Sequence, residues 1–325
     1  MGLSDERQSF SRDLTIAIVN WNTEKYLLAC LNSIMGNVKN ITYEVIIADN
    51  GSSDGSQEAV KNEFPGVSLI ENRQNLGYAK ANNRIFSLAK GRNLLLLNPD
   101  TLILKDSLEA MVKLLDSSGD CAGVCPKLLN PDGSFQRLYK RWPNLKVFIC
   151  KQALLLPRLI PAEYKDKIMR GYLYSLPGDR FDRVRDLEQP PASCLMLKMR
   201  ILKDIGLFDE RFPLFFNDVD LCRRIHNNGY KIYFLPDARI VHFLGKGHDI
   251  KRKMENREFF IGWLKYLKKH NGLLAYGIAE FILFCEFTAL TGVNLLFDLF
   301  QNKKRSRLRN NLRFRLEILF NKTSF

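Results

Sequence analysis

Continuous apolar runs alternate with amphipathic stretches along the first 120 residues of the chain. Runs such as LTIAIVNW, YEVIIAD and LLLLN indicate buried strands, and the stretches between them space their apolar residues as amphipathic helices do. The pattern predicts strands at 14–21, 43–49, 67–71 and 93–98, separated by helices at 23–35, 54–64, 78–89 and 106–115. This alternation predicts an α/β fold, in which right-handed crossovers build a Rossmann-like, mostly parallel sheet flanked by helices. Unbroken apolar runs are typical of strands that are buried on both faces.

The pattern becomes less regular after Cys121. Residues 122–136 read as a strand and a turn, with NPDGS as the turn signal. Residues 137–190 mix aromatic, basic and proline-rich stretches and give no firm assignment. A further strand is predicted at 192–199, a short helix to about 205, and a strand at 231–235.

Polar side chains follow three of the predicted strands. Asn20 ends the first strand, Asp49 ends the second, and the fourth runs from LLLL into Asn98 and Asp100. Ligands of open parallel sheets bind beyond the carboxyl ends of the strands. Each residue alone is also a common turn former, but three strands that deliver polar groups to one edge favour a binding site there. Pro99 lacks an N–H and ends strand pairing, which presents Asp100 at that edge.

Charge is distributed unevenly along the 325 residues. The net charge is +14, and a surplus of nine positive charges falls after residue 250. The seven cysteines form no paired CxxC framework for zinc, and most lie in apolar runs, which favours a reducing compartment. The N-terminus, MGLSDERQSFSRD, lacks the apolar core of a secretory signal. We therefore expect a cytoplasmic protein.

Five motifs in a fixed order carry a resemblance to a known family. They are IVNWN at 18–22, IIADNGSSDGS at 46–56, NLGYAKANN at 75–83, LLLLNPD at 94–100 and GLFDERFPLFFNDVDLCRR at 206–224. In this order the chain resembles glycosyltransferase family 2, the inverting sugar transferases with the GT-A fold, and especially the rhamnosyltransferase-like enzymes of bacterial surface polysaccharides. The resemblance implies a GT-A catalytic domain over residues 1–250, with a nucleotide-sugar half at about 14–120 and an acceptor half at 121–250.

The resemblance assigns a divalent metal, Mg²⁺ or Mn²⁺, to the end of the LLLLNPD strand. Asp100 matches the acid that binds the metal, which in turn holds the diphosphate of a nucleotide-sugar. Asn98 stands where many relatives have a second carboxylate, so we expect weak metal binding without the nucleotide. His242 matches a histidine that approaches the metal or the diphosphate, although a histidine after a strand is often structural.

The same resemblance places the nucleoside near the first two strand ends. Asp49 matches the acid that accepts a hydrogen bond from the base, which suits the imide N–H of uracil or thymine and a pyrimidine donor. The backbone of Val19, the side chain of Asn20, and Asn75 are expected to help seat the donor.

Asp218 matches the general base that removes the proton of the acceptor hydroxyl. The family usually has a Glu-Asp pair, whereas here Asn217 precedes the aspartate, which removes one neighbouring charge. Asp218 also lies just before the predicted helix DLCRRIHNN, which begins at Asp220, so an alternative role is stabilisation of a helix N-terminus.

Residues 251–325 form an amphipathic, basic helical segment outside the resemblance. In residues 255–270 the large apolar side chains share one face. The apolar stretch 273–300 is interrupted by acids, and its longest charge-free run, 287–297, is too short for a bilayer span of about 20 residues. These features predict attachment to an anionic membrane surface, on the cytoplasmic face of the inner membrane. The alternative is a helical pair packed on the catalytic domain or in a dimer.

The predicted activity is metal-assisted, inverting transfer of a sugar from a nucleotide-sugar to a glycan or polyprenyl-linked acceptor. The resemblance makes rhamnose the first candidate for that sugar. A second hypothesis is a catalytically silent relative that acts as a membrane-bound assembly partner, prompted by Asn98 and Asn217. A third, a nucleic-acid binder, does not explain the acids at the strand ends, and we expect no nucleic acid as partner. The sequence leaves the oligomeric state open.

Overall fold

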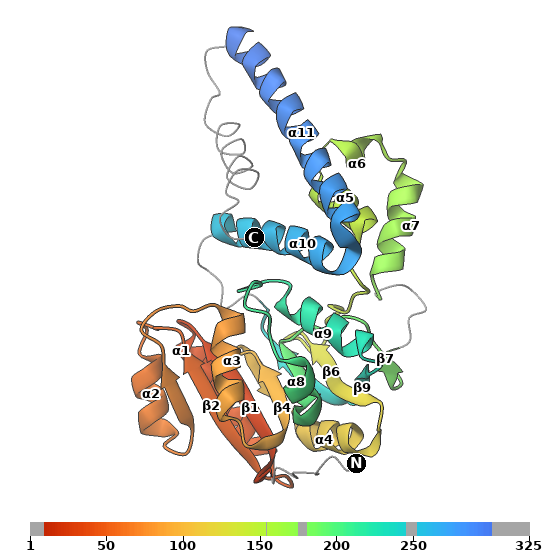
Figure 1. The fold of residues 1–325 in the computed structure, drawn as a ribbon. Coiled ribbons are helices and arrows are strands. Elements are labelled where there is room, and N and C mark those ends of the chain that lie inside the picture. Colours follow the sequence, from red (N-terminus) through yellow and green to blue (C-terminus); the bar gives the residue numbers. More distant parts are fainter. Residues whose placement is uncertain (1–9, 154, 175–180, 245–251, 301–325) are drawn as a thin grey trace, which may run out of the picture. The chain divides into compact units, whose positions relative to one another are not determined.

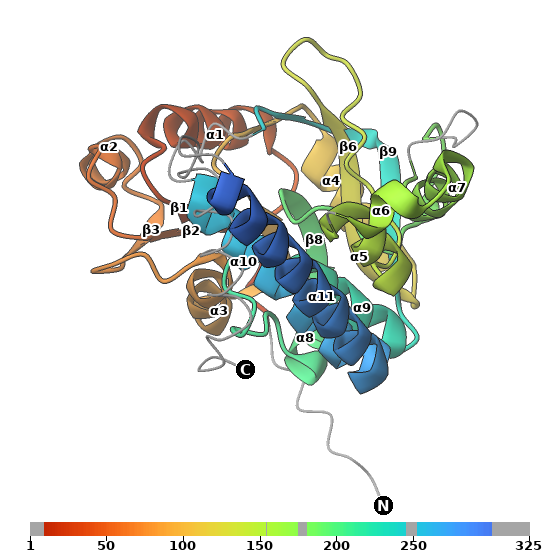
Figure 2. The same ribbon diagram turned by 90° about the horizontal axis from the view of Figure 1, so that it is seen from above.

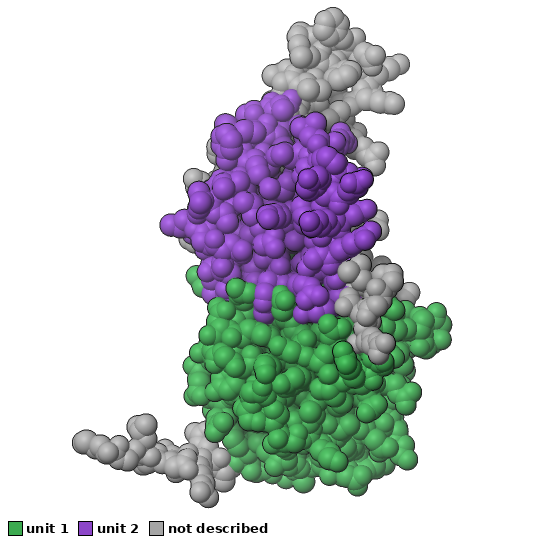
Figure 3. Space-filling model, turned by 90° about the vertical axis from the view of Figure 1, so that its right-hand side faces the viewer, with its two compact units in different colours: residues 1–140, 177–249 green, residues 141–176, 250–325 purple. Residues whose placement is uncertain are grey.

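The computed structural model describes residues 10–153, 155–174, 181–244 and 252–300. The chain divides into two compact units, which Figure 3 shows in different colours. Unit 1 consists of residues 1–140 and 177–249, and unit 2 of residues 141–176 and 250–325. The division near residue 250 corresponds to the predicted one, but residues 141–176 group with the C-terminal helices and not with the predicted acceptor half.

Unit 1 is built on one mixed sheet of nine strands within the described residues, in the order β3-β2-β1-β4-β8-β6-β9-β5, with β7 beside β9 (Figure 1). The strands are β1 Arg12–Asn20, β2 Tyr43–Asp49, β3 Ser68–Glu71, β4 Gly91–Leu97, β5 Thr101–Ile103, β6 Cys121–Leu129, β7 Arg185–Asp186, β8 Cys194–Lys198 and β9 Lys231–His242. The first four strands run parallel, whereas β8 is antiparallel to β4 and to β6. The predicted α/β fold class is confirmed.

Helices cover both faces of this sheet, as Figure 2 shows for α1, α2 and α4 on one side and for α3, α8 and α9 on the other. Their bounds are α1 Glu24–Asn37, α2 Ser56–Glu63, α3 Tyr78–Leu88, α4 Ser107–Ser117, α8 Met199–Ile205 and α9 Asn217–Asn227. The four leucines Leu94 to Leu97 are fully buried, because alternate side chains of β4 point to opposite, covered faces.

The strand predicted at 231–235 and the stretch ARIVH at 238–242, which the sequence also indicates as a strand, belong to one strand, β9. β9 continues to His242 because its pairing with β6 resumes after an irregularity at residues 236–238. Leu235 pairs with Pro126, and Arg239 pairs with the next residue of β6, Lys127. A proline within a strand is tolerated at such a bulge. The continuation matters for the site, since it carries His242 to the edge where β4 ends.

Unit 2 is helical, and its helices contact one another. They are α5 Leu145–Gln152, α6 Leu156–Leu159, α7 Ala162–Tyr172, α10 Arg252–Tyr266, a π-helical turn Leu267–Asn271, and α11 Gly272–Phe300. Phe148 of α5 packs edge-on against Phe260 and Trp263 of α10, with ring centroids 5.8 Å apart in both pairs. The carboxylate of Glu286 in α11 accepts from the backbone N–H groups of Leu155 and Leu156.

These contacts correct the predicted role of the apolar face of residues 255–270. Phe260, Trp263, Leu264 and Leu267 are at most 9% exposed, so this face packs within the protein, as the alternative expected. Within the residues that the structure describes, no helix is long and apolar enough to cross a membrane. The predicted basic segment at 301–325 lies outside the described residues.

Candidate active site

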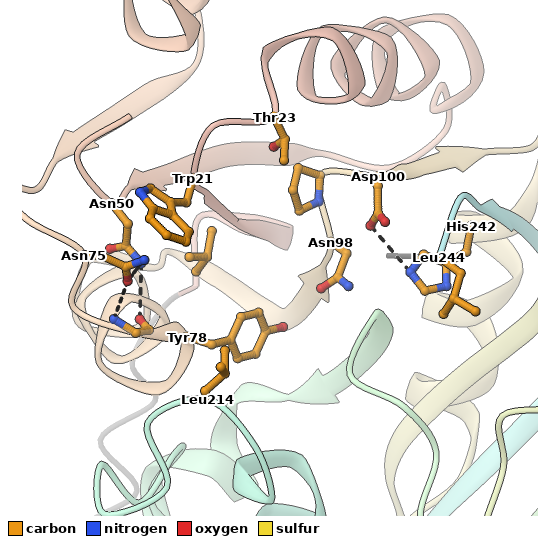
Figure 4. A pocket seen from close by; sticks show the side chains of 13 residues that line it. Trp21, Thr23, Asn50, Asn75, Tyr78, Asn98, Asp100, Leu214, His242 and Leu244 are labelled. Atoms are coloured by element: carbon orange, nitrogen blue, oxygen red, sulfur yellow. Dashed lines mark hydrogen bonds and ion pairs between the residues drawn. The ribbon is translucent and has the colours of Figure 1, made fainter. Parts of the chain in front are cut away.

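A pocket of about 250 Å³ opens at the carboxyl edge of the parallel strands of unit 1 (Figure 4). Trp21, Asn50 and Asn75 lie at one end of the view, Asp100 and His242 at the other, and Asn98 between them. The residues that line it come from the ends of β1, β2, β4 and β9 and the loops beyond them: Val19, Trp21, Thr23, Asn50, Asn75, Gly77, Tyr78, Asn98, Pro99, Asp100, Leu214, His242 and Leu244. The structure thus brings together five of the predicted site residues, namely Val19, Asn75, Asn98, Asp100 and His242.

Asp100 and His242 meet because of the register between two short stretches of strand. Thr101, the first residue of β5, pairs with His242 at the end of β9, and the N–H of Phe243 donates to the carbonyl oxygen of Asp100 at 2.9 Å. This pairing sets His242 Nε2 3.4 Å from Asp100 Oδ1 (Figure 4). The two side chains are 4% and 5% exposed and both reach the pocket.

This pair fits the metal that the resemblance implies. An imidazole nitrogen and a carboxylate oxygen converge at the pocket, and both are ligands that Mn²⁺ accepts. Among the described residues no group of three or more His, Cys, Asp and Glu side chains could hold a metal ion. Mg²⁺ and Mn²⁺ at nucleotide sites commonly take one or two protein ligands and complete their shell with phosphate oxygens and water.

In the structure, protein groups contact the side chains of both Asp49 and Asn20, and their predicted contact with the nucleoside stays a prediction. Asp49 is 1% exposed, and its carboxylate accepts from Asn20 Nδ2, from the N–H and Oγ of Ser52, and from Gln57 Nε2, at 2.6–2.8 Å. Asn20 is fully buried, and its Oδ1 accepts from the hydroxyl of Thr23. A carboxylate has about four acceptor positions, so Asp49 is occupied by the protein and fastens the NGSSDGS loop to β1.

The end of the pocket away from Asp100 contains Trp21, which the sequence analysis did not assign, and Asn50, a polar residue that follows the second strand. Trp21 follows β1 directly and presents an aromatic side chain to the pocket, and Asn50 follows β2. The Asn50 amide donates to Asn75 Oδ1 at 3.2 Å, and Asn75 Oδ1 also accepts from the N–H of Gly77 at 2.8 Å. The position of Trp21 immediately after a predicted strand was a signal that could have marked it.

Gly77 is required at its position by the backbone. Its φ of +78° favours glycine, and a Cβ there would lie 2.9 Å from the carbonyl oxygen of Pro213. That oxygen accepts from the N–H groups of Tyr78 and Ala79 at 2.8 and 3.2 Å. The start of α3 is therefore tied to the loop before α9, and both contribute side chains to the pocket.

Asp218 lies in the first turn of α9 and is not among the residues that line the pocket, but its charge acts on the pocket residue Tyr78. Burial raises the pKa of Asp218, against the effects of the backbone N–H of Val219 and of the positive charge of Lys140. A carboxylate with a raised pKa is a stronger proton acceptor than an ordinary surface aspartate.

Asn217 and Asp220 have structural contacts that explain their identities. The buried amide of Asn217 donates to the carbonyl oxygens of Phe212 at 3.3 Å and Leu214 at 3.0 Å. A carboxylate could make neither contact, since it only accepts. Asp220 accepts from Arg224 Nε at 2.9 Å in a buried ion pair within α9.

Comparison with known proteins agrees with this fold. The model of glycosyl transferase family 2 matches residues 15–170. The N-acetylglucosaminyl-diphospho-decaprenol L-rhamnosyltransferase of Mycobacterium tuberculosis is 26% identical over 234 residues, which are 64% of this chain and 68% of that enzyme. Residues 15–170 of this chain therefore carry the features of glycosyl transferase family 2.

Two solved structures place this chain in the GT-A fold. The mannosyltransferase PcManGT of Pyrobaculum calidifontis, in complex with GDP-Man and Mn²⁺, aligns with a TM-score of 0.52 and 15% identity over 96% of this chain and 88% of that chain. S. aureus TarS in complex with UDP-GlcNAc aligns with the same score and identity over 96% of this chain and 73% of that chain. The predicted GT-A fold is confirmed.

Proposed function

We propose that the protein catalyses a single-displacement, inverting sugar transfer in which Asp218 is the general base. Asp218 takes the proton of the acceptor hydroxyl, the hydroxyl oxygen forms a bond to the anomeric carbon, and the bond from that carbon to the diphosphate breaks. The observation that carries the proposal is the pocket that joins Asp100 and His242 at one end to Trp21 and Asn75 at the other, beside the first turn of α9.

The diphosphate end of the donor is assigned to Asp100, His242 and Asn98. Asp100 and His242 would hold a divalent metal, Mn²⁺ or Mg²⁺, which when bound neutralises charge on the leaving diphosphate. Asn98 reaches the pocket between the two ends and supplies a neutral amide where relatives have a carboxylate. With one carboxylate at this end, metal affinity depends strongly on the diphosphate.

The nucleoside is assigned to the end of the pocket formed by Val19, Trp21, Asn50 and Asn75, with the indole as a stacking surface for the base. A pyrimidine donor, with thymidine diphosphate rhamnose as first candidate, is supported by the rhamnosyltransferase relative. Because Gln57 Nε2 occupies Asp49 Oδ1, an imide N–H reaches that carboxylate only if Gln57 moves away.

The test is a titration of the protein with a panel of nucleotide-sugars, dTDP-rhamnose, UDP-GlcNAc and GDP-mannose, with and without Mn²⁺. We expect one pyrimidine donor to bind in a metal-dependent way, and Asp100→Ala to abolish the metal dependence. Asp218→Asn should bind the donor as wild type does while transfer to a lipid-linked acceptor falls about 10²–10⁴-fold. NMR of the product anomer tests inversion. Folded protein that binds no nucleotide-sugar would favour the silent assembly partner.

Unit 2 is proposed to attach the enzyme to the cytoplasmic face of the inner membrane, where polyprenyl-linked acceptors are available. The support is the outer face of α11, where Leu273, Leu274, Phe281 and Phe284 are 49–79% exposed although large and apolar. On a helix these positions fall on one side. The exposed side chains of Lys268 and Lys269 immediately precede α11, which suits an anionic lipid surface.

Sedimentation with vesicles tests this attachment. The full chain should bind phosphatidylglycerol vesicles, and the double substitution Phe281→Ser and Phe284→Ser should reduce binding at least tenfold, since burying a large apolar side chain contributes about 1.5–3 kcal/mol. Leu88→Ser is the matched control, because Leu88 is equally apolar and 55% exposed, but lies in unit 1. Dimers that depend on these phenylalanines, without vesicle binding, would instead assign the face to a second copy of the chain.

A further inference from the structure

A chain of hydrogen bonds leads from the turn after β6 to His242. The carboxylate of Asp132 accepts from Ser134 Oγ at 2.6 Å, and Ser134 Oγ accepts from Asn130 Nδ2 at 2.8 Å. Asn130 Oδ1 accepts from Gln136 Nε2 at 2.8 Å, and Gln136 Oε1 lies 2.8 Å from His242 Nδ1. Asp132 is exposed, whereas Gln136 and His242 are each 4% exposed.

The direction of these hydrogen bonds is fixed at both ends. Hydrogen bonds from Ser134 lower the pKa of Asp132, and an ionised carboxylate only accepts, so the Ser134 hydroxyl hydrogen points outward. At the inner end, Gln136 Nε2 gives its second hydrogen to the backbone carbonyl oxygen of His242 at 3.0 Å, and a carbonyl oxygen also only accepts. The Gln136 atom that faces His242 Nδ1 is therefore the amide oxygen.

It follows that Nδ1 of His242 carries the hydrogen. In a neutral imidazole the other nitrogen, Nε2, then presents a lone pair. Nε2 points to Asp100 Oδ1, 3.4 Å away, so two acceptor atoms converge without a hydrogen between them. Such an arrangement suits a cation that both atoms bind.

We propose that Gln136 is a positioning residue that holds His242 in the Nδ1–H tautomer, so that Nε2 and Asp100 together bind the divalent cation of a nucleotide diphosphate. This inference rests on the metal-dependent donor binding proposed above. Gln136 is 106 residues from His242 in sequence and does not line the pocket, so it acts through the histidine and not on the substrate. Partners of this kind commonly change metal affinity about 10–100-fold when they are removed.

The first test needs no substitution of Gln136. Two-dimensional ¹⁵N NMR of the imidazoles in the metal-free protein at pH 7.5, with His242→Asn to assign the signals, distinguishes the two tautomers and the doubly protonated ring. We expect Nδ1 protonated and Nε2 unprotonated, and a shift of the Nε2 signal when Mg²⁺ and UDP are added together. A ring with Nε2 protonated, alone or with Nδ1, would overturn the proposal.

The second test measures Mn²⁺ affinity in the presence of UDP by electron paramagnetic resonance. Gln136→Leu removes the acceptor for Nδ1–H and should weaken Mn²⁺ binding about 10–100-fold. Gln136→Glu loses the donors to Asn130 Oδ1 and to the His242 carbonyl oxygen and should be less stable than wild type. It keeps an acceptor for Nδ1–H, so the Mn²⁺ affinity of its folded protein should stay within about threefold of wild type. Gln152→Leu, at a half-buried glutamine of α5 in unit 2, is the control for the substitution itself.

The outcomes separate this inference from the proposed function. If wild type binds Mn²⁺ and UDP together and folded Gln136→Leu protein binds them equally well, the proposed role of Gln136 is overturned. The proposed metal site is then still supported. Wild type that binds no metal with UDP overturns both proposals. If Gln136→Leu does not fold, the Glu variant and the tautomer of the wild type still decide.

Discussion

Replacing Asn217 by aspartate should destabilise this protein, although the family usually has a carboxylate at this position. Asn217 is 3% exposed, and its amide donates to the carbonyl oxygens of Phe212 and Leu214. Asn217→Asp removes both donors and puts a carboxylate oxygen against two carbonyl oxygens. A buried acceptor left without a partner costs about 1–3 kcal/mol. The contact at 3.3 Å to Phe212 is long and belongs at the low end of that range.

The expected loss at pH 7 is about 3 kcal/mol, from about 1 kcal/mol at Phe212 and about 2 kcal/mol at Leu214. For a unit of roughly 150–250 residues this lowers Tm by about 6–12 °C. The introduced carboxyl group is favoured in its protonated form in the folded state, so its pKa is raised above the value of the unfolded chain. The variant should therefore lose least below about pH 4 and more as the pH rises through the folded-state pKa.

Thermal unfolding followed by circular dichroism between pH 4 and pH 8 is the assay. Asn217→Ala removes the donors without adding a charge, and its loss should not depend on pH. Asn62→Asp is the matched control, because Asn62 is exposed in α2, and its effect should stay within about 0.5 kcal/mol. The reasoning is refuted if Asn217→Asp unfolds at the wild-type temperature at every pH.

Three further predictions follow from the contacts of the site. Lys140→Met removes the positive charge that lowers the pKa of Asp218, so the acid limb of a kcat/KM–pH profile should move to higher pH; an unmoved limb would exclude Asp218 as the titrating base. Gly77→Ala, at a φ of +78° and with a Cβ 2.9 Å from Pro213 O, should lower the unfolding free energy by about 1–3 kcal/mol and raise the donor KM, measured by denaturant titration and initial rates. Asp49→Ala leaves its buried donors unpaired and should cost at least about 2 kcal/mol of stability without ligand; a variant as stable as wild type, with only nucleotide affinity reduced, would support the base-contact role.

Sequence patterns were sufficient to predict the sheet edge that carries the site. The unbroken apolar runs of β1 and β4 placed Val19 and Asp100 correctly at that edge, because period and burial are local properties of a strand. The length of β9 was not predictable in this way, since a proline at 236 normally ends a strand and only the pairing with β6 carries it past that point. Without that pairing, nothing in the sequence brings His242 beside Asp100.

Long-range pairing also explains why other parts were missed. Residues 137–190 contain the short helices α5, α6 and α7. α5 packs on α10 and α11, Glu286 of α11 accepts from the backbone before α6, and α7 contacts α5. Their apolar residues therefore match partners more than 100 residues away, and no local period reveals them. The apolar face of residues 255–270 was assigned to a membrane for the same reason, because a face that packs on α5 and one that packs on lipid have the same composition.

The two acids at strand ends show how a structural carboxylate differs from one available to a ligand. Asp49 ends β2, and Asp100 lies between β4 and β5; the two are almost equally buried, at 1% and 5% exposed. After Asp49 the chain turns through NGSSDGS, and the N–H and hydroxyl of Ser52, with Gln57, supply donors that fill its acceptor positions. After Asp100 the chain enters β5 at once, so the next N–H groups serve the pairing with β9, and the carboxylate is left with His242 Nε2 alone among the described contacts. The decisive difference is the supply of hydrogen-bond donors in the residues that follow each acid, which is why the loop holds Asp49 whereas Asp100 faces the pocket.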